Sequence, residues 1–439
     1  MNIIKSDEFD SYWKNKACQK DDEAVEAAVK EIIAEVSRDG DVAVRGFASR
    51  FDKSSPQELE IPVQTVKQAV VELRRNDPGL ASAMELAADH IKRFSMRQRD
   101  QFSDFEFEME KGLFTGQRVI PVDRAAVYVP GGRFPLFSCV LMGLIPAFCA
   151  GVEEVILASP PLEDGFPDRK ILAAAVIAAD IFAGEPAEKS RLRVFAVGGA
   201  QAIAALALGT QSIPRVDLIV GPGNKYVAVA KRILFGKVGI DFIAGPTDVL
   251  IIADGSAGAD LVAADMIAQA EHDPDARARA LVPSGELADQ IASAVEKRLA
   301  SLPTAVTARA SLEAGGLVII YKTQEEAVRI ANAIAPEHLE LQVDCADSWI
   351  PRLKNYGSLF IGSLSAEALG DYSAGINNTL PTSASARFSG GLSVRHFLKT
   401  VTALRCAPGA GFEKACNTAE TLARAEGLEG HAQSAAARV

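Results

Sequence analysis

A glutamine and a histidine lie three residues apart in the segment DMIAQAEHDPDA, residues 265–276. The segment has the composition of a buried helix, and Pro274 requires that helix to end. Gln269 and His272 therefore face the same side of its last turn. An amide oxygen and an imidazole in this arrangement can bind a divalent metal ion. A hydrated capping cluster at the helix end is the alternative that the spacing leaves open.

The chain has five histidines, and imidazole is the side chain that binds divalent metals or moves protons near neutral pH. His90 lies in a charged helical stretch and His396 in SVRHFLK, which favours structural or solvated roles for both. Asp371, in a long irregular segment, and His431, near the C-terminus, could complete an oxygen and nitrogen ligand set suited to zinc. Sequence spacing does not show whether they converge.

Glu337 and His338 are adjacent in the segment APEHLEL, at the predicted junction of a helix and a strand. A carboxylate beside an imidazole can divide two proton transfers between them if the loop directs both into one cleft. An exposed loop pair is the alternative.

The elements that must position these residues change type along the chain. The first 120 residues are mainly helical, with apolar residues at roughly 3.6-residue spacing. Short strands, each followed by a turn and a helix, then recur as AAVYV, EEVILAS, RVFAV and DLIV, and a second series contains DVLIIAD, RALVP, GLVIIY, LELQV and SLFIG. These units predict two α/β domains with parallel sheets, followed by a helical tail. Their glycine turns could cradle a diphosphate, although none matches G-x-G-x-x-G.

Composition excludes several classes of protein. The net charge is -11 and no Lys/Arg-rich run offsets it, so nucleic acid is not an expected partner. The N-terminus carries charges where a secretory signal needs an apolar core, which predicts a cytoplasmic protein. The apolar run at 136–152 is too short to span a bilayer and contains Pro146, so we expect a buried helix and no membrane partner.

Taken together, the segments resemble the histidinol dehydrogenase family from about residue 25 to His431. The matching pieces are YVPGG, PLFS.VLM, VGGAQAIAALA.GT, VD.I.GPGN, ID..AGP, QAEHDPDA, APEHLEL, GDY..G.N..LPT and EGL..H. Members of this family are homodimeric enzymes that use zinc and two NAD⁺ to oxidise a primary alcohol, through an aldehyde, to a carboxylate. The resemblance implies zinc binding by Gln269, His272 and Asp371, with His431 supplied by the partner subunit.

The resemblance also assigns the catalytic and cofactor residues. His338 is expected to be the general base, first for the alcohol and then for the aldehyde hydrate. Glu337 is expected to activate the water that attacks the aldehyde. Tyr128, Gln201 and Asn224 match the family's contacts to NAD⁺.

The family's fold consists of two incomplete Rossmann-like domains, each doubly wound. By resemblance, residues 25–127 join 247–392 in the domain that carries the metal and catalytic residues, and residues 128–246 form the NAD⁺-binding domain. A helical segment at 1–24 precedes them. A small helical tail at 393–439 is expected to contribute to the partner's active site.

Two departures from the family pattern concern the substrate. Asn378 replaces a histidine that usually helps to hold the substrate, and Thr247 replaces a serine, whereas the substrate contact Glu426 is retained. Exchanging an imidazole for an amide changes which substrates a buried site accepts. Asn378 could donate to a sulfonate, so we expect a paralogue that oxidises 2,3-dihydroxypropane-1-sulfonate to sulfolactate.

Three other functions compete with this expectation. Oxidation of L-histidinol to L-histidine is the first alternative, and it uses the same residues. A zinc hydrolase would use the metal with Glu337 and His338 but would need no nicotinamide. A non-catalytic nucleotide-binding protein would bind NAD⁺ without requiring His338. Because function does not follow from fold alone, the residues of the active site must distinguish these alternatives.

Overall fold

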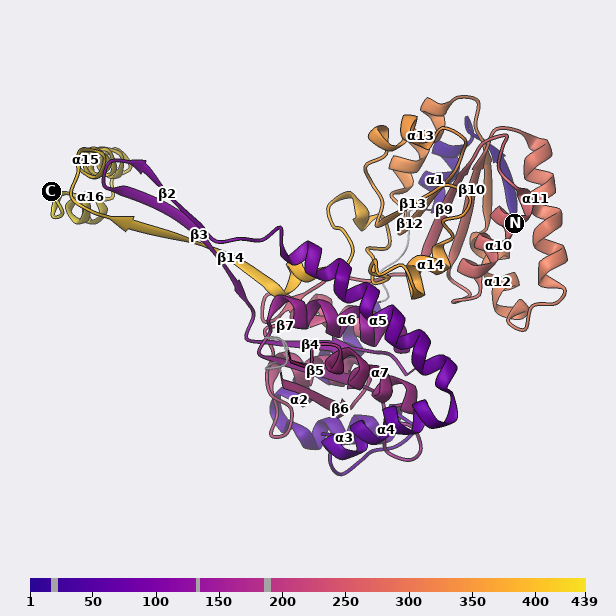
Figure 1. The fold of residues 1–439 in the computed structure, drawn as a ribbon, viewed down its shortest axis with the longest axis horizontal. Helices are drawn as coiled ribbons and strands as arrows, with labels where there is room; N and C mark the ends of the chain where they lie inside the picture. Colours follow the sequence, from indigo (N-terminus) through magenta and orange to yellow (C-terminus); the bar gives the residue numbers. More distant parts are fainter. Residues whose placement is uncertain (17–22, 132–134, 185–190) are drawn as a thin grey trace.

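The structure is a computed structural model of the 439-residue chain, and it describes residues 1–16, 23–131, 135–184 and 191–439. Two α/β units lie side by side, and a long arm extends from them (Figure 1). The strands predicted from both series are present, and every strand pair in the two large sheets is parallel. The predicted α/β class with parallel sheets is therefore confirmed.

One unit is built on a six-stranded sheet in the order β1-β11-β10-β9-β12-β13. Its strands are β1 (Asn2–Lys5), β9 (Asp248–Ala253), β10 (Arg277–Val282), β11 (Leu317–Ile320), β12 (His338–Gln342) and β13 (Ser358–Ile361). Helices α10 (Ala259–Ala270), α11 (Gly285–Leu299) and α12 (Ala305–Gly315) pack on one face, and α1 (Phe9–Lys16) and α13 (Gln324–Ile334) pack on the other. The short α14 (Glu367–Tyr372) follows β13.

The other unit is built on a five-stranded sheet in the order β6-β5-β4-β7-β8. Its strands are β4 (Arg124–Tyr128), β5 (Glu154–Ser159), β6 (Arg191–Ala196), β7 (Leu218–Val220) and β8 (Gly239–Ile240). Helices α4 (Val63–Asn76), α5 (Pro78–Arg99), α6 (Phe137–Ala150) and α7 (Arg169–Asp180) cover one face. Helices α2 (Glu23–Asp39), α3 (Asp41–Phe51), α8 (Gly199–Leu208) and α9 (Lys225–Leu234) cover the other.

The expected grouping of residues 25–127 with 247–392 is wrong. Val29 and Phe47 share a core with Phe195, and Met84 shares one with Val155, so α2 to α5 belong to the five-stranded sheet. The apolar stripes of these four helices extend the cover that the crossover helices α6 to α9 give the sheet. Strand β1 and helix α1 join the six-stranded sheet instead, which corrects the separate segment expected at 1–24.

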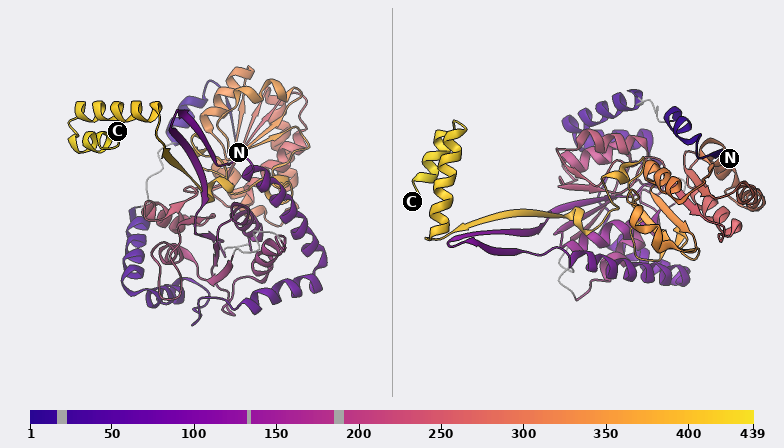
Figure 2. Two further views of the ribbon diagram at one scale, coloured as in Figure 1. Left: turned by 60° about the vertical axis from the view of Figure 1, so that its left-hand side comes forward. Right: turned by 90° about the horizontal axis from the view of Figure 1, so that it is seen from above.

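A three-stranded arm carries the C-terminal helices away from both units (Figures 1 and 2). It contains β2 (Phe105–Glu110), β3 (Leu113–Pro121) and β14 (Leu398–Cys406), paired antiparallel. Helices α15 (Ala410–Ala425) and α16 (Glu429–Ala436) form the predicted tail at its tip, where α15 packs on α16, β2 and β3. Strands β2 and β3 lie in a region predicted to be mainly helical.

The apolar run at 136–152 forms the buried helix α6, as predicted. Among the described residues, no helix combines the length and apolar composition needed to cross a bilayer. The five described cysteines are free thiols, and Cys18 lies outside the described residues.

Candidate active site

A cavity of about 150 Å³ brings together most of the predicted chemistry. It lies where the carboxyl ends of strands in the five-stranded sheet meet the amino ends of strands in the six-stranded sheet. We call it the site cavity. Its lining includes Thr247, His272, Glu337, His338, Asp371 and Asn378. Chain segments that are more than a hundred residues apart in sequence thus meet at one point.

Potential metal ligands cluster beside this cavity. One ligand atom each of His272, Glu367 and Asp371 lies within 4.8 Å of the others. Helix α10 ends at Ala270, which leaves Gln269 buried in its last turn and His272 exposed just beyond it. The predicted approach of His272 to Asp371 is therefore present, and Glu367 joins them.

The amide of Gln269 tests whether this cluster suits a cation. With its nitrogen donating to Thr247 Oγ1 at 2.8 Å, the amide oxygen faces the two Glu367 oxygens at 2.9 and 3.2 Å. Buried acceptor atoms at this separation need a proton or a cation between them. With the amide turned, its nitrogen donates to Glu367 instead and its oxygen accepts from Thr247. A metal ion at this point would require the first orientation, because an amide coordinates through oxygen. The amide oxygen, the imidazole of His272 and the carboxylate of Asp371 are donors that zinc accepts.

Glu337 is buried at the junction of α13 and β12. The chain turns there through Ala335, whose φ of 50° ends the helix, and Pro336. Glu337 Oε2 accepts hydrogen bonds from Thr247 Oγ1 at 2.5 Å and from the Asp248 backbone N–H at 3.1 Å. Burial raises the pKa of Glu337 to about 7, although the neighbouring His338 and the bond from Thr247 oppose the shift. The carboxyl group can therefore exchange a proton near neutral pH.

His338 is buried among three carboxylates. Its Nδ1 lies 3.6 Å from Glu367 and 3.9 Å from Glu337, and its Nε2 lies 3.7 Å from Asp371. Burial by itself would lower the pKa of His338, but the charges of Glu367, Glu337 and Asp371 raise it well above its usual value. Among the described residues Nε2 has no hydrogen-bond partner, so in the neutral form of His338 this nitrogen can take a proton from a bound substrate.

The three predicted cofactor residues lie near the carboxyl ends of strands in the five-stranded sheet, where α/β sheets bind nucleotides. Tyr128 ends β4, and its hydroxyl accepts from the Gly199 N–H at 3.1 Å. Gln201 is buried in the first turn of α8 and donates to Asp52 at 3.4 Å. Asn224 caps α9 by accepting from two backbone N–H groups. These hydrogen bonds fix the three side chains at that edge of the sheet, and the cofactor role of each stays a prediction.

The two predicted contributors from the C-terminal tail lie away from this cavity within one chain. Glu426 caps α15 and His431 lies on α16, and both side chains are exposed. Both helices are at the tip of the arm, remote from α14 and β12 (Figure 1). A single chain therefore leaves His431 apart from the metal cluster.

Glu367 was missed by sequence reasoning, although a signal for it existed. It precedes Asp371 by four residues in the segment EALGD, which places two carboxylates one turn apart on α14. Its side chain is buried, and burial raises its pKa well above the usual value. Helix α14 was not predicted, because it is short and lies in a stretch whose composition suggests irregular structure.

Comparison with known proteins gives a consistent result. The family model described as histidinol dehydrogenase matches residues 15–439. A histidinol dehydrogenase of Thermus thermophilus is 46% identical over 415 residues, which cover 94% of each chain. That of Pseudomonas syringae is 40% identical over 95% of this chain and 90% of its own. The solved structure of histidinol dehydrogenase from Elizabethkingia anophelis has a TM-score of 0.88 at 32% identity and covers 98% of this chain and 95% of its own.

The expected activity on 2,3-dihydroxypropane-1-sulfonate is wrong. The similar proteins are histidinol dehydrogenases at 40 to 46% identity over nearly the whole chain, and they favour the alternative substrate. The site is consistent with this correction. Asn378 Nδ2 donates to the Asp371 carbonyl at 3.2 Å, and the buried Asn378 Oδ1 has no partner among the described residues. The free oxygen is an acceptor, so this position is compatible with a substrate that carries an N–H group.

Proposed function

Because the chain belongs to the histidinol dehydrogenase family, a family of oxidoreductases, we propose that it oxidises L-histidinol to L-histidine with two NAD⁺. For a primary alcohol the balance is RCH₂OH + 2 NAD⁺ + H₂O → RCOO⁻ + 2 NADH + 3 H⁺. The observation that carries the proposal is the buried pair Glu337 and His338, which lines the site cavity beside a cluster of metal-ligating groups.

His338 supplies the base for both oxidations. Its unpartnered Nε2 takes the alcohol proton as hydride leaves for the first NAD⁺, and later takes the proton of the hydrate as hydride leaves for the second. The surrounding carboxylates stabilise the imidazolium that each transfer forms. Glu337 acts between these steps by activating the water that converts the aldehyde to its hydrate.

Gln269, His272 and Asp371 would hold a zinc ion, with His431 of the partner subunit as a further ligand. When bound, zinc orients and polarises the substrate without carrying electrons. Thr247 fixes both Gln269 and Glu337 through its hydroxyl group. The free Asn378 Oδ1 would accept from an N–H of the substrate, and Glu426 of the partner subunit would meet its imidazole end.

The arm supports the proposal of a homodimer with shared active sites. Its exposed apolar side chains, Phe105, Phe107 and Leu404, and Leu422 of α15, need a partner surface. Swapping of arms between two copies would cover them and bring His431 to the other copy's metal ligands. NAD⁺ would bind at the carboxyl edge of the five-stranded sheet, near Tyr128, Gln201 and Asn224.

The test is turnover of L-histidinol by the purified protein with NAD⁺, followed by identification of the product by mass spectrometry. The proposal expects L-histidine, formed only when NAD⁺ is present and lost after chelation of zinc. Formation of NADH with L-histidinal as the final product would contradict the four-electron reaction. Absence of any NADH would contradict the substrate.

A further inference from the structure

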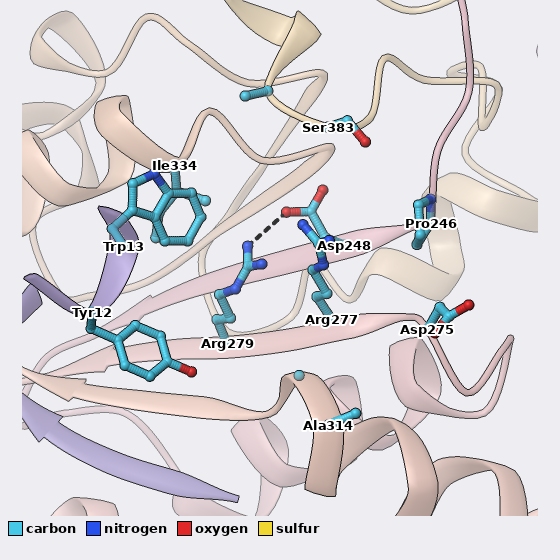
Figure 3. Close-up of a pocket in the computed structure, with 12 residues that line it drawn as sticks. Tyr12, Trp13, Pro246, Asp248, Asp275, Arg277, Arg279, Ala314, Ile334 and Ser383 are labelled. Carbon is cyan, nitrogen blue, oxygen red and sulfur yellow. Dashed lines mark hydrogen bonds and ion pairs between the residues drawn. The ribbon is translucent and has the colours of Figure 1, made fainter. Parts of the chain in front are cut away.

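Asp248 and Arg279 form a buried ion pair directly behind Glu337. Asp248 begins β9 and Arg279 lies on the neighbouring β10, and they are 6% and 5% exposed respectively. Arg279 Nη1 donates to Asp248 Oδ2 at 2.9 Å, as Figure 3 shows. The guanidinium also lies 5.1 Å from the centre of the Trp13 ring. Packing and charge thus hold the carboxylate of Asp248 in one place.

Asp248 contacts Glu337 at two points. Its Oδ1 accepts from the Glu337 backbone N–H at 3.1 Å, and its own backbone N–H donates to Glu337 Oε2 at 3.1 Å. The Glu337 carbonyl is held on its other side by the Ser358 N–H at 2.9 Å. The bonds from Asp248 and Thr247 both use Oε2 and leave Oε1 for a water molecule. Asp248 therefore fixes the main chain and the carboxylate of Glu337 together.

The ion pair also controls charge. The carboxylate of Asp248 contributes to the raised pKa of Glu337, in addition to the larger effect of burial. Arg279 neutralises Asp248, which limits that contribution and keeps Glu337 able to accept a proton. Without the guanidinium, two buried carboxylates would face each other.

We propose that Asp248, paired with Arg279, is a positioning residue for the water step of the reaction. This inference rests on the proposed oxidation of L-histidinol. In that step Glu337 takes a proton from water while the water oxygen bonds to the aldehyde carbon and the carbonyl π pair moves to oxygen. Glu337 then returns the proton to that oxygen, which gives the hydrate. The first oxidation uses no water, so Asp248 acts on the second half of the reaction alone.

A second cavity makes this testable by chemical rescue. We call it the rear cavity; it measures about 450 Å³ and is lined by Asp248, Arg279, Arg277 and Asp275 among others (Figure 3). Replacing Asp248 by alanine would leave a space, continuous with this cavity, that can admit formate beside the guanidinium of Arg279. Asp275→Asn is the matched control, because Asp275 lines the same cavity but, among the described residues, makes no hydrogen bond to Glu337.

The experiment compares two half-reactions in Asp248→Ala, Asp275→Asn and the wild-type enzyme. Alcohol oxidation is measured as NADH from L-histidinol with the aldehyde trapped by semicarbazide, and aldehyde oxidation as NADH from L-histidinal. We expect Asp248→Ala to slow aldehyde oxidation by about 100-fold and alcohol oxidation by less than about threefold. Formate should restore much of the aldehyde oxidation, while Asp275→Asn should match the wild type in both.

The inference is overturned if Asp248→Ala slows both half-reactions equally, or slows neither. Failure of formate to restore aldehyde oxidation would also overturn it. If Asp248→Ala does not fold, Asp248→Asn keeps the volume but places an amide N–H₂ against Arg279, and the same selective loss is expected. Failure of the wild-type enzyme to oxidise L-histidinol would instead refute the proposed function. Thermal unfolding midpoints and zinc content of each variant separate a positioning role from a general loss of structure.

Discussion

The arm predicts that two inactive variants restore each other's activity. His338 lies in the site cavity, whereas His431 lies on α16 at the arm's tip. Strand β14 has nine residues, so the arm reaches roughly 30 Å at about 3.4 Å per residue. A single chain whose arm points away cannot supply its own His431. Chains carrying His338→Ala and His431→Ala should each lose at least about 100-fold in activity, through the base and the metal respectively.

In mixed dimers, one of the two sites combines an intact body with an intact tail. Random pairing of equal amounts makes about half of the dimers mixed, so the mixture should regain about a quarter of wild-type activity. The assay is NADH formation after co-expression, with each variant alone and each mixed with wild type as controls. Activity that stays at the level of the single variants would show that each site is built within one chain.

Three further predictions concern stability and metal. Lys231 and Asp241 form an ion pair whose side chains are 2% and 0% exposed. Lys231→Met should therefore lower the free energy of unfolding, measured in urea, by about 3–5 kcal/mol, because it leaves a buried charge unpaired. The double variant Lys231→Met/Asp241→Asn should recover part of this loss. Burial raises the pKa of Asp52 to about 6, so the native state holds a proton that the unfolded chain releases, and stability falls as pH rises from about 4 to 6. Above pH 6, Asp52→Asn should therefore raise the free energy of unfolding by about 1 kcal/mol, after allowance for partial exposure, and should raise the thermal midpoint accordingly. Near pH 4 it should have little effect. His272→Ala should lower zinc affinity at least tenfold in a competition titration with a chelator.

Much of the architecture followed from local patterns. The short segments at 124–128 and 248–253 are strands because nearly all of their residues are apolar, on both faces. Helix α6 is buried because its composition is apolar all round. Gln269, His272, Glu337 and Asp371 were identified from residue types with the family resemblance. Each of these features depends on a short segment of sequence, so it can be predicted without knowledge of the tertiary packing.

Features that depend on distant contacts were not predictable in this way. The sequence of α2 to α5 predicts amphipathic helices but not which sheet their apolar stripes cover, and the grouping of 25–127 was accordingly wrong. Strand β2 is exposed along the arm and β3 is largely half-buried, so neither shows the alternation of buried and exposed residues that marks a strand in sequence. Asp248 became relevant only when β9 placed it beside Glu337, 89 residues later. The expected sulfonate substrate rested on the type of one residue, Asn378, whose hydrogen bonds depend on the folded chain.

The most direct test of the proposed function is the number of NADH formed per L-histidinol when the substrate is limiting. The four-electron reaction predicts two NADH per L-histidinol, with none after zinc is removed and activity regained when zinc is added back. One NADH per L-histidinol, with the aldehyde accumulating, would contradict the assigned role of Glu337. No NADH would contradict L-histidinol as the substrate.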